Sequence, residues 1–285
     1  MRPDPGPPPA PAAAEHVLDV AALTDIGTER VNNEDACGTI VEGPCAIVAV
    51  ADGVSSGAGG EVASEMAVEV TLRAWREESA SLGAGQRLYR AVQQANIEIY
   101  DRAVAVPELR GMATTLVAVA VDRGELTAVH VGDSRLYLVR GGEIVQLTKD
   151  HTVAAEKVRF GLLSKEKARE SPDRSVLTRS VGRELIVSRD RLSRTVEQGD
   201  VLLLCSDGLY NVLRDEEIAA AVSPAEDAGA AARALVDAAN ARGTGDNLTA
   251  AVVRVVSGLA AGGAPIAPPA GGIGGMVRRL LGRGS

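Results

Sequence analysis

Four aspartates lie in four short motifs that are far apart along the chain, and each motif adjoins a hydrophobic run. They are Asp35 in RVNNEDA, Asp52 in IVAVADGV, Asp207 in VLLLCSDGL and Asp246 in GTGDNLTAAVV. We expect each aspartate to stand at the end of a buried strand, where an unpaired carboxylate is costly. Four such ends that meet at one point would form an oxygen-rich pocket for hard divalent cations. The pattern therefore favours metal-assisted hydrolysis.

Composition narrows the class of protein. The chain has 285 residues, of which 46% are hydrophobic and only 2% aromatic, so a large core must be built from Ala, Val, Leu and Ile. The scarcity of aromatic side chains and the net charge of -8 argue against a nucleic-acid partner.

Cysteine usage and hydropathy bear on the location of the protein. The three cysteines, Cys37, Cys45 and Cys205, fit neither a disulfide framework nor a zinc site, which favours a reducing cytoplasm. No stretch approaches ~18 uninterrupted apolar residues, so we expect no membrane span.

The chain divides into three parts by composition. Residues 1–14 form a flexible leader rich in Pro and Ala, residues 15–257 one globular domain, and residues 258–285 a Gly/Ala/Pro tail with a short basic end. Within the domain, residues 151–185 are polar with helical pieces, and we expect them to form a flap insertion. The basic end, residues 276–283, is either a frayed, solvated terminus or a short docking helix for a partner or an anionic membrane face.

Alternating or β-branched residues predict eight strands. They span residues 17–24, 45–52, 114–121, 125–131, 135–140, 143–148, 201–206 and 248–256. The turns at 122–124 and 141–142 are short enough to join antiparallel neighbours as hairpins.

Apolar residues at helical spacing predict three long helices, over residues 60–79, 86–105 and 224–241. Ser223 and Glu226 form a capping-box pattern at the start of the third helix. Two groups of antiparallel strands with long helices between them indicate an α+β layered domain and not a doubly wound sheet.

Asp52, Asp207 and Asp246 share a local pattern that has two interpretations. Asp52 and Asp207 each follow an apolar run and precede a glycine, and Asp246 precedes the run that begins at Leu248. Gly53 permits a tight turn that can direct a carbonyl oxygen to the same ion as Asp52. Alternatively, each aspartate is an ordinary turn residue whose carboxylate accepts hydrogen bonds from backbone amides. The three patterns together favour a shared metal site.

Arg30 lies five residues before Asp35. Its guanidinium has the geometry to hold a phosphate through two parallel hydrogen bonds. The alternative is a surface arginine that pairs with Glu29 or Glu34.

Three further polar groups have structural interpretations. We interpret the Gly-Asp-Ser-Arg motif at 132–135 as a turn in which the aspartate bonds turn amides. His151 opens the insertion and has the chemistry for proton transfer, although a loop histidine is more often solvated. His130 stands between two valines and is interpreted as a strand residue with a polar neighbour.

Several other catalytic designs are absent from the sequence. None of the three cysteines is followed six positions later by arginine, so the Cys-x5-Arg phosphatase loop is missing. Three separated histidines cannot supply a histidine-rich bimetal site. There is no GxxxxGK[ST] loop and no GxSxG elbow. A carboxylate bimetal site remains the main chemical option.

Seven motifs in order resemble those of a known family. They are Arg30…Glu34-Asp35, Ala51-Asp52-Gly53, Gly111-Met112-Ala113-Thr114-Thr115, Val131-Gly132-Asp133-Ser134-Arg135, Leu147-Thr148-Lys149-Asp150-His151, Cys205-Ser206-Asp207-Gly208-Leu209 and Gly245-Asp246-Asn247-Leu248-Thr249. The chain resembles the metal-dependent protein serine/threonine phosphatases of the type 2C class, the PPM family, in bacterial form. The resemblance runs from about residue 17 to residue 256.

This resemblance implies a fold and a metal site. The fold would be a four-layer α-β-β-α sandwich, with two central antiparallel sheets flanked by helices. Two Mn²⁺ or Mg²⁺ ions would lie at one edge. Asp52 would bridge both ions, the Gly53 carbonyl would bind one, and Asp207 and Asp246 would bind the other.

The resemblance also implies roles for residues around the ions. Glu34 and Asp35 would orient metal-bound water, and Arg30 would hold the substrate phosphate. The insertion at 151–185 would be the flap beside the active site.

The chain departs from the family pattern at several points. Eukaryotic relatives carry a histidine just after the Asp-Gly, proposed as a general acid, and Val54 stands there in this chain. The glycine-rich run of bacterial relatives is replaced by residues 54–57. Bacterial relatives often hold a third ion with an aspartate before Gly-Met-x-Thr-Thr. Glu108 matches that position, and we expect it to share the third ion with Asp207.

The expected activity is hydrolysis of phosphoserine and phosphothreonine in proteins, reversing kinase signalling. The expected mechanism is a single step in which a water activated by two cations attacks phosphorus in line. The expected partners are phosphorylated proteins, among them a Ser/Thr kinase, with the chain a cytoplasmic, bacterial monomer. Two alternatives stay open: a phosphatase of small metabolites, and a phosphatase-like module that binds a phosphoprotein without cleaving it.

Overall fold

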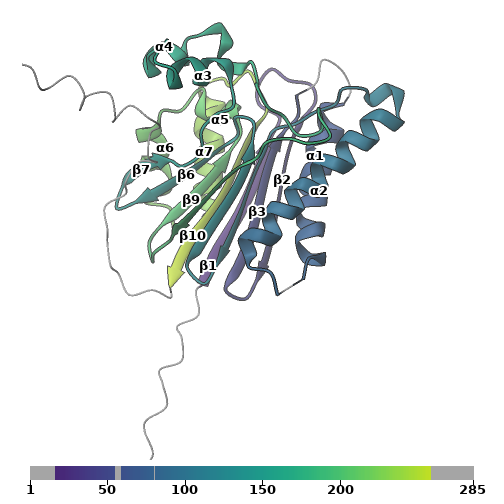
Figure 1. The fold of residues 1–285 in the computed structure, drawn as a ribbon. Coiled ribbons are helices and arrows are strands. Elements are labelled where there is room, and N and C mark those ends of the chain that lie inside the picture. The colour runs from purple at the N-terminus through teal and green to yellow at the C-terminus, as the bar shows by residue number, and fades with distance from the viewer. Residues whose placement is uncertain (1–16, 55–58, 80, 258–285) are drawn as a thin grey trace, which may run out of the picture.

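Two five-stranded antiparallel sheets form the centre of the molecule. The computed structural model describes residues 17–54, 59–79 and 81–257. The first sheet has the order β1-β10-β9-β6-β7 and the second the order β2-β3-β4-β5-β8. The two sheets pack face to face, and helices cover both outer faces (Figure 1). The expected α-β-β-α sandwich is confirmed.

Ten strands make up the two sheets. They are β1 (Val17–Asp25), β2 (Asp35–Glu42), β3 (Cys45–Asp52), β4 (Leu116–Asp122), β5 (Glu125–Val131), β6 (Arg135–Arg140), β7 (Glu143–Gln146), β8 (Asp190–Thr195), β9 (Val201–Cys205) and β10 (Leu248–Ser257).

Seven α-helices and two 3₁₀ turns lie in the described part of the chain. They are α1 (Gly60–Glu77), α2 (Ala84–Ala105), η1 (Pro107–Leu109), α3 (Val153–Arg159), α4 (Lys165–Arg169), η2 (Pro172–Ser175), α5 (Asp207–Tyr210), α6 (Asp215–Val222) and α7 (Ala228–Ala241).

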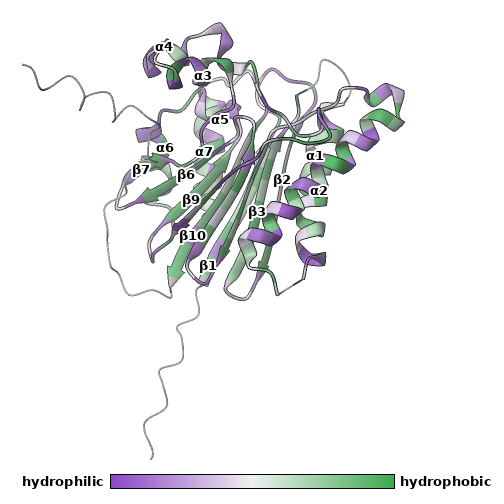
Figure 2. Ribbon diagram, viewed as in Figure 1, coloured by the Kyte–Doolittle hydropathy of each residue, from purple (hydrophilic) through white to green (hydrophobic). Residues whose placement is uncertain are grey.

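The central strands are apolar on both faces because each face is covered. In β3, Val48 and Val50 pack into the layer between the sheets, whereas Ile47 and Ala49 pack against α1 and α2. β9 follows the same alternation, with its second face covered by α5, α6 and α7. Figure 2 shows these strands largely in hydrophobic colours and the helices in mixed colours. Successive side chains of a strand point to opposite faces of the sheet, and here both faces are covered. Such a strand is therefore a continuous apolar run in the sequence.

Both predicted hairpin turns contain residues with positive φ. Arg123 and Gly124 have φ of 47° and 82° between β4 and β5, and Gly141 and Gly142 have φ of 59° and 84° between β6 and β7. Two successive positive φ angles define the type I′ turn, whose twist matches that of the flanking strands. The expected antiparallel pairing of these strands is confirmed.

The sequence patterns missed β2 and β8. Both are edge strands of the second sheet, and most of their residues are half-buried or exposed. An edge strand needs fewer apolar residues, so its sequence lacks the buried run that marked the central strands. The eight predicted strands are all present, with ends that differ by at most a few residues.

The third predicted helix begins in the wrong place. Residues 215–222 form the separate helix α6, and α7 begins only at Ala228, with the Asp227 carboxylate accepting from the Ala230 amide at 2.6 Å. Ser223 does not cap α7: it ends α6, and its hydroxyl donates to the Ala219 carbonyl. The capping-box interpretation of Ser223 and Glu226 is therefore wrong.

The segment that we expected to be a flap lies between β7 and β8. It contains α3, α4 and η2, and Arg169 of α4 pairs with Asp215 of α6 at 3.3 Å. The leader at 1–14 and the tail at 258–285, with its basic end, lie outside the described residues. Among the described residues, no helix is long and apolar enough to cross a membrane.

Leu202→Ala should lower the free energy of unfolding by ~2–5 kcal/mol, because Leu202 is fully buried between the sheets. Urea denaturation measures the change. Leu162→Ala is the matched control, since Leu162 is 75% exposed, and should change stability by less than ~0.5 kcal/mol. Equal stability of the two variants would contradict the layered core.

Candidate active site

The four aspartates meet at one edge of the paired sheets, but not all of them end strands. Asp52 is the last residue of β3, whereas Asp35 is the first residue of β2 and stands directly opposite it. Asp207 follows β9 and Asp246 precedes β10. In antiparallel sheets the start of one strand lies beside the end of the next. The expectation that each aspartate ends a buried run was therefore wrong for Asp35, whereas Asp246 precedes its run as its motif indicated, and all four reach the same edge.

Asp52 is held by its backbone, and its carboxylate is left free. Its amide donates to the Thr115 hydroxyl at 2.9 Å, and its carbonyl accepts from the Thr115 amide and the Thr114 hydroxyl, both at 2.8 Å. Within residues 17–54, 59–79 and 81–257, nothing donates to its carboxylate. The alternative of a turn aspartate satisfied by backbone amides finds no support in this part of the chain.

Burial and neighbouring charges act together on Asp52. Burial raises its pKa well above the ordinary value, and repulsion from Asp35, Asp207 and Asp133 raises the pKa further. These acidic groups therefore lie close enough to Asp52 to disfavour one another's ionisation.

Gly53 allows three segments to approach closely. Its amide donates to the Glu34 carbonyl at 2.9 Å. A Cβ at Gly53 would lie 2.3 Å from the Gly60 carbonyl oxygen, and a Cβ at Gly60 would lie 2.8 Å from the Glu34 carboxylate. Glu34 thus lies over the first turn of α1. Burial raises the pKa of Glu34, and the Arg30 guanidinium opposes this shift.

Asp35 connects the two sheets. Its carboxylate accepts from the Ser206 hydroxyl at 2.5 Å and from the Thr249 hydroxyl at 2.7 Å, and both donors belong to the first sheet or its loops. Burial raises the pKa of Asp35 to about 7, against the opposing effect of these two hydrogen bonds. Asp35 is therefore fixed in position beside Asp52.

The turns that carry Asp207 and Asp246 are packed against each other. A Cβ at Gly208 would lie 2.0 Å from the Asn247 carbonyl oxygen, so only glycine permits this approach. Burial raises the pKa of Asp207 to about 6, and Asp246 adds to the shift. The Asn211 side chain donates to the Asp207 carboxylate at 3.0 Å.

Asn247 ties the loop that follows β1 to this edge. Its amide nitrogen donates to the carbonyls of Ile26 and Asn32, both at 2.9 Å. Its amide oxygen accepts from the backbone of Glu34 at 2.8 Å. One buried side chain therefore fixes the loop that contains Arg30 and Glu34.

Arg30 pairs with Asp246 and not with Glu29 or Glu34. Its guanidinium lies 2.8 Å from the Asp246 carboxylate and 3.3 Å from the Gly245 carbonyl. The Arg30 side chain is 48% exposed, so the guanidinium stands at the rim of the acidic cluster.

Asp133 is a member of the cluster that sequence reasoning missed. It is 6% exposed, and burial followed by repulsion from Asp207 raises its pKa to about 8. The interpretation of its motif as a purely structural turn was wrong in this respect. The available signal was the buried run of β5, which ends at Val131, two residues before Asp133, and resembles the run of β3 that ends at Asp52.

Glu108 lies exposed in η1, and the charged groups that shift the pKa of Asp207 are Asp246, Arg135 and Arg30. Within the described residues no hydrogen bond or ion pair joins Glu108 to Asp207, and its assignment as a partner of Asp207 stays a prediction. Asp133 is a second candidate, because the charge of Asp207 raises the pKa of Asp133.

His151 is buried and not solvated, contrary to the expectation for a loop residue. His130, His151 and Asp190 each place one ligand atom within 4.8 Å of the others, as a metal site would require. The Arg179 guanidinium, however, lies 3.2 Å from His151 and 2.8 Å from Asp190. The imidazole rings of His130 and His151 are stacked, with their centroids 4.8 Å apart and an angle of 15° between their planes. The lone pairs of their nitrogens therefore lie in separate, nearly parallel planes and do not point to one ion. This arrangement is that of a structural cluster held by an arginine.

His130 bonds its neighbour as expected, since its Nε2 lies 3.0 Å from the Lys149 carbonyl oxygen. Its Nδ1 is buried and has no partner within the described residues. Burial lowers the pKa of His130 to about 4. It is therefore a neutral strand residue near neutral pH.

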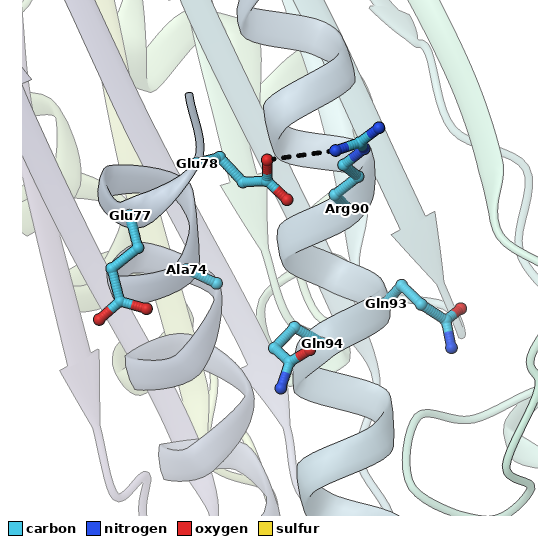
Figure 3. A pocket seen from close by; sticks show the side chains of 6 residues that line it. All are labelled: Ala74, Glu77, Glu78, Arg90, Gln93 and Gln94. Carbon is cyan, nitrogen blue, oxygen red and sulfur yellow. Dashed lines mark hydrogen bonds and ion pairs between the residues drawn. The ribbon is translucent and has the colours of Figure 1, made fainter. Parts of the chain in front are cut away.

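A surface hollow lies on the outer face of α1 and α2, away from the acidic cluster. It has a volume of about 520 Å³, and its lining includes Glu78 and Arg90, which pair at 3.4 Å (Figure 3). The remaining lining side chains are those of Ala74, Glu77, Gln93 and Gln94. An open surface hollow whose lining is not mainly apolar is a poor ligand site.

Comparison with known proteins gives one consistent result. The family described as "Protein phosphatase 2C" matches residues 28–243. The serine/threonine phosphatase stp of Listeria innocua is 37% identical over 234 residues, which cover 81% of this chain and 93% of that protein.

Solved structures agree. The Mycobacterium tuberculosis serine/threonine phosphatase PstP/Ppp has a TM-score of 0.77 and 34% identity, covering 84% of this chain and 99% of its own. The catalytic domain of PstP in complex with 2 manganese ions has a TM-score of 0.75 and 34% identity, and the match covers 85% of this chain and 100% of that one.

A four-layer sandwich with a carboxylate cluster at one edge of its sheets defines a class of metal-dependent protein serine/threonine phosphatases. The chain belongs to the protein phosphatase 2C family. The fold and the phosphatase function that the resemblance implies are confirmed.

The stability of the metal-free protein should fall as the pH rises from 5 to 8. The folded-state pKa values of Asp35, Asp133 and Asp207 are raised to about 7, 8 and 6, above the unfolded value of ~3.9. A carboxyl with a raised pKa stabilises the fold at low pH, and this contribution is lost as the pH passes the folded pKa. We expect a loss of more than ~1.4 kcal/mol, the equivalent of one pKa unit.

Urea denaturation in chelator at several pH values measures this dependence. Asp35→Asn should flatten the slope, because the variant removes one of the titrating groups. Stability that is constant or rises between pH 5 and 8 would contradict the crowding of these carboxylates.

Proposed function

We propose that this chain hydrolyses phosphoserine and phosphothreonine in proteins with two divalent cations, Mn²⁺ or Mg²⁺. The ligands would be the carboxylates of Asp52, Asp207 and Asp246 and the carbonyl of Gly53. The convergence of buried carboxylates at the edge of the paired sheets is the observation that carries this proposal.

The donor set fits such ions. Carboxylate and carbonyl oxygens are the ligands that hard cations prefer. Asp52 is at the centre of the acidic groups, and within the described residues its carboxylate accepts no hydrogen bond. Crowded carboxylates with raised pKa values repel one another, and bound cations would relieve that repulsion.

Bound cations would supply an activated water and neutralise charge on the phosphoryl oxygens. Glu34 and Asp35 flank Asp52 and would orient that water. Asp35 is suited to this role because the hydroxyls of Ser206 and Thr249 fix its carboxylate.

Protonation of the leaving group needs a donor other than a residue after the Asp-Gly, because Val54 stands there. His151 is engaged elsewhere, with its Nδ1 accepting from the Gly132 amide at 3.1 Å. Glu34, whose pKa is raised by burial, is a titratable group of the site that could hold a proton at its carboxylate.

Arg30 would hold the substrate phosphate. Its exposed guanidinium at the rim could exchange the Asp246 carboxylate for phosphate oxygens, which it can contact through two parallel hydrogen bonds. A third cation, where bound, would lie between Asp133 and Asp207.

Phosphorylated proteins are the substrates that this activity requires. A Ser/Thr kinase among the partners, a monomeric state and a cytoplasmic location stay predictions. The segment at 151–185, which carries Arg169 in contact with α6, would form one wall beside the site.

Asp52→Asn should lower turnover of a phosphothreonine peptide at least ~100-fold in the presence of Mn²⁺, because the amide removes the charge at the centre of the ligand set. Rates are measured with Mn²⁺ and with chelator, and circular dichroism reports that the fold is retained. Glu108→Gln is the matched control and should keep the rate of the unmodified chain. Full activity of Asp52→Asn would rule out this ligand assignment.

A further inference from the structure

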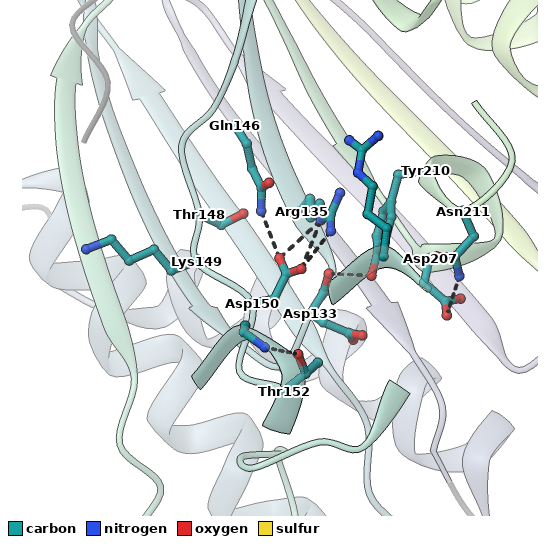
Figure 4. A network of polar contacts seen from close by, with 12 residues as sticks. Asp133, Arg135, Gln146, Thr148, Lys149, Asp150, Thr152, Asp207, Tyr210 and Asn211 are labelled. Carbon is teal, nitrogen blue, oxygen red and sulfur yellow. Dashed lines mark hydrogen bonds and ion pairs between the residues drawn. The ribbon is translucent and has the colours of Figure 1, made fainter. Parts of the chain in front are cut away.

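Tyr210 links two acidic segments of the site. Its hydroxyl donates to the main-chain carbonyl of Asp133 at 3.1 Å. Tyr210 also stands at the end of α5, the short helix that begins with Asp207. One side chain therefore joins the turn that carries Asp133 to the helix that carries Asp207 (Figure 4).

The ring of Tyr210 is itself held in place. The Arg135 guanidinium stacks on it, with the central carbon 3.6 Å from the ring centre. Asp150 pairs with Arg135 at 2.7 Å, and the Tyr137 hydroxyl accepts from Arg135 at 2.8 Å. The Arg135 side chain is 14% exposed. Because the Arg135 guanidinium is buried and is held by both Asp150 and Tyr137, the Tyr210 ring stacked against it has little freedom to turn.

Gly132, the residue before Asp133, is held by a different group, His151. Its amide donates to His151 Nδ1 at 3.1 Å, and its carbonyl accepts from the His151 amide at 3.0 Å. The Ser134 hydroxyl lies 2.6 Å from the Thr115 hydroxyl. Between these two anchors, Tyr210 is the side chain that holds the backbone of Asp133 itself.

Holding Asp133 beside Asp207 opposes their mutual repulsion. Both carboxylates are buried, and each has a pKa raised above its ordinary value. Without a link, two like charges at such a site would separate. A fixed separation also lowers the cost of placing one cation between them.

We propose that Tyr210 is a positioning residue whose hydroxyl fixes the separation of Asp133 and Asp207 and thereby sets the affinity of the cation held between them. The inference rests on the proposed function, because it requires that cations bind among these carboxylates.

Mn²⁺ binding by Tyr210→Phe tests the proposal without substrate. Isothermal titration of the full chain with Mn²⁺ should show that the weakest binding step loses about fivefold in affinity, the scale of one lost hydrogen bond, while the tightest step is unchanged. Tyr137→Phe is the matched control: it removes a hydroxyl that contacts Arg135 but not Asp133, and should bind Mn²⁺ as the unmodified chain does.

Hydrogen exchange of the metal-free proteins gives a second reading that needs no cation. Amides in the segment 131–135 should exchange faster in Tyr210→Phe than in the unmodified chain, and no faster in Tyr137→Phe. This measurement reports how firmly the turn is held.

The proposal is overturned if Tyr210→Phe matches the unmodified chain in all Mn²⁺ binding steps, or if Tyr137→Phe loses as much affinity. An unmodified chain that bound no Mn²⁺ would instead refute the proposed function. Hydrogen exchange would then decide the role of Tyr210 alone: faster exchange at 131–135 supports it, and unchanged exchange overturns it.

Discussion

Repulsion among buried carboxylates is the constraint on which the rest of the site depends. Asp35, Asp52, Asp133 and Asp207 lie close together at one edge of the sheets, and burial raises the pKa of each. Such an arrangement destabilises the fold near neutral pH unless positive charge enters it. If stability of the fold were the only requirement, apolar or amide side chains would serve better at these positions. Cations bound among them, as proposed, would turn the repulsion into coordination and would explain their presence.

The antiparallel topology makes this crowding possible. Asp35 opens one strand and Asp52 closes its neighbour, so the two lie opposite each other although seventeen positions separate them. Glycines then remove the side chains that would hold the turns apart, as Gly208 does against Asn247. Hydrogen bonds to backbone groups fix each turn, so the carboxylates stay directed at the site. The sheet supplies rigidity, and the loops supply chemistry.

Much of the fold could be predicted from the sequence because the central strands and long helices are buried in regular patterns. Edge strands β2 and β8 escaped detection because they bury too little to leave an apolar run. The start of α7 was misplaced because Ser223 and Asp227 are both acceptable caps, and a tertiary contact, the Asp19 carboxylate accepting from the Ala228 amide, favours the start at Ala228. Local sequence could not make that choice.

The site was partly predictable for a related reason. Asp52 ends the buried strand β3 and Asp207 follows the buried strand β9, and that pattern suggested their role. Asp133 carries the same pattern, but its motif also reads as an ordinary turn, and its approach to Asp207 depends on the packing of α5. Glu108 was chosen by its place in the sequence, which says nothing about its distance from Asp207. Spatial convergence of separate loops is the part that single motifs cannot specify.

A crystal structure of the protein grown with Mn²⁺, with anomalous diffraction measured at the manganese edge, tests the central claim most directly. The account predicts anomalous peaks enclosed by the carboxylates of Asp52, Asp207 and Asp246. Carboxylates that point apart, with no peak between them, would contradict it.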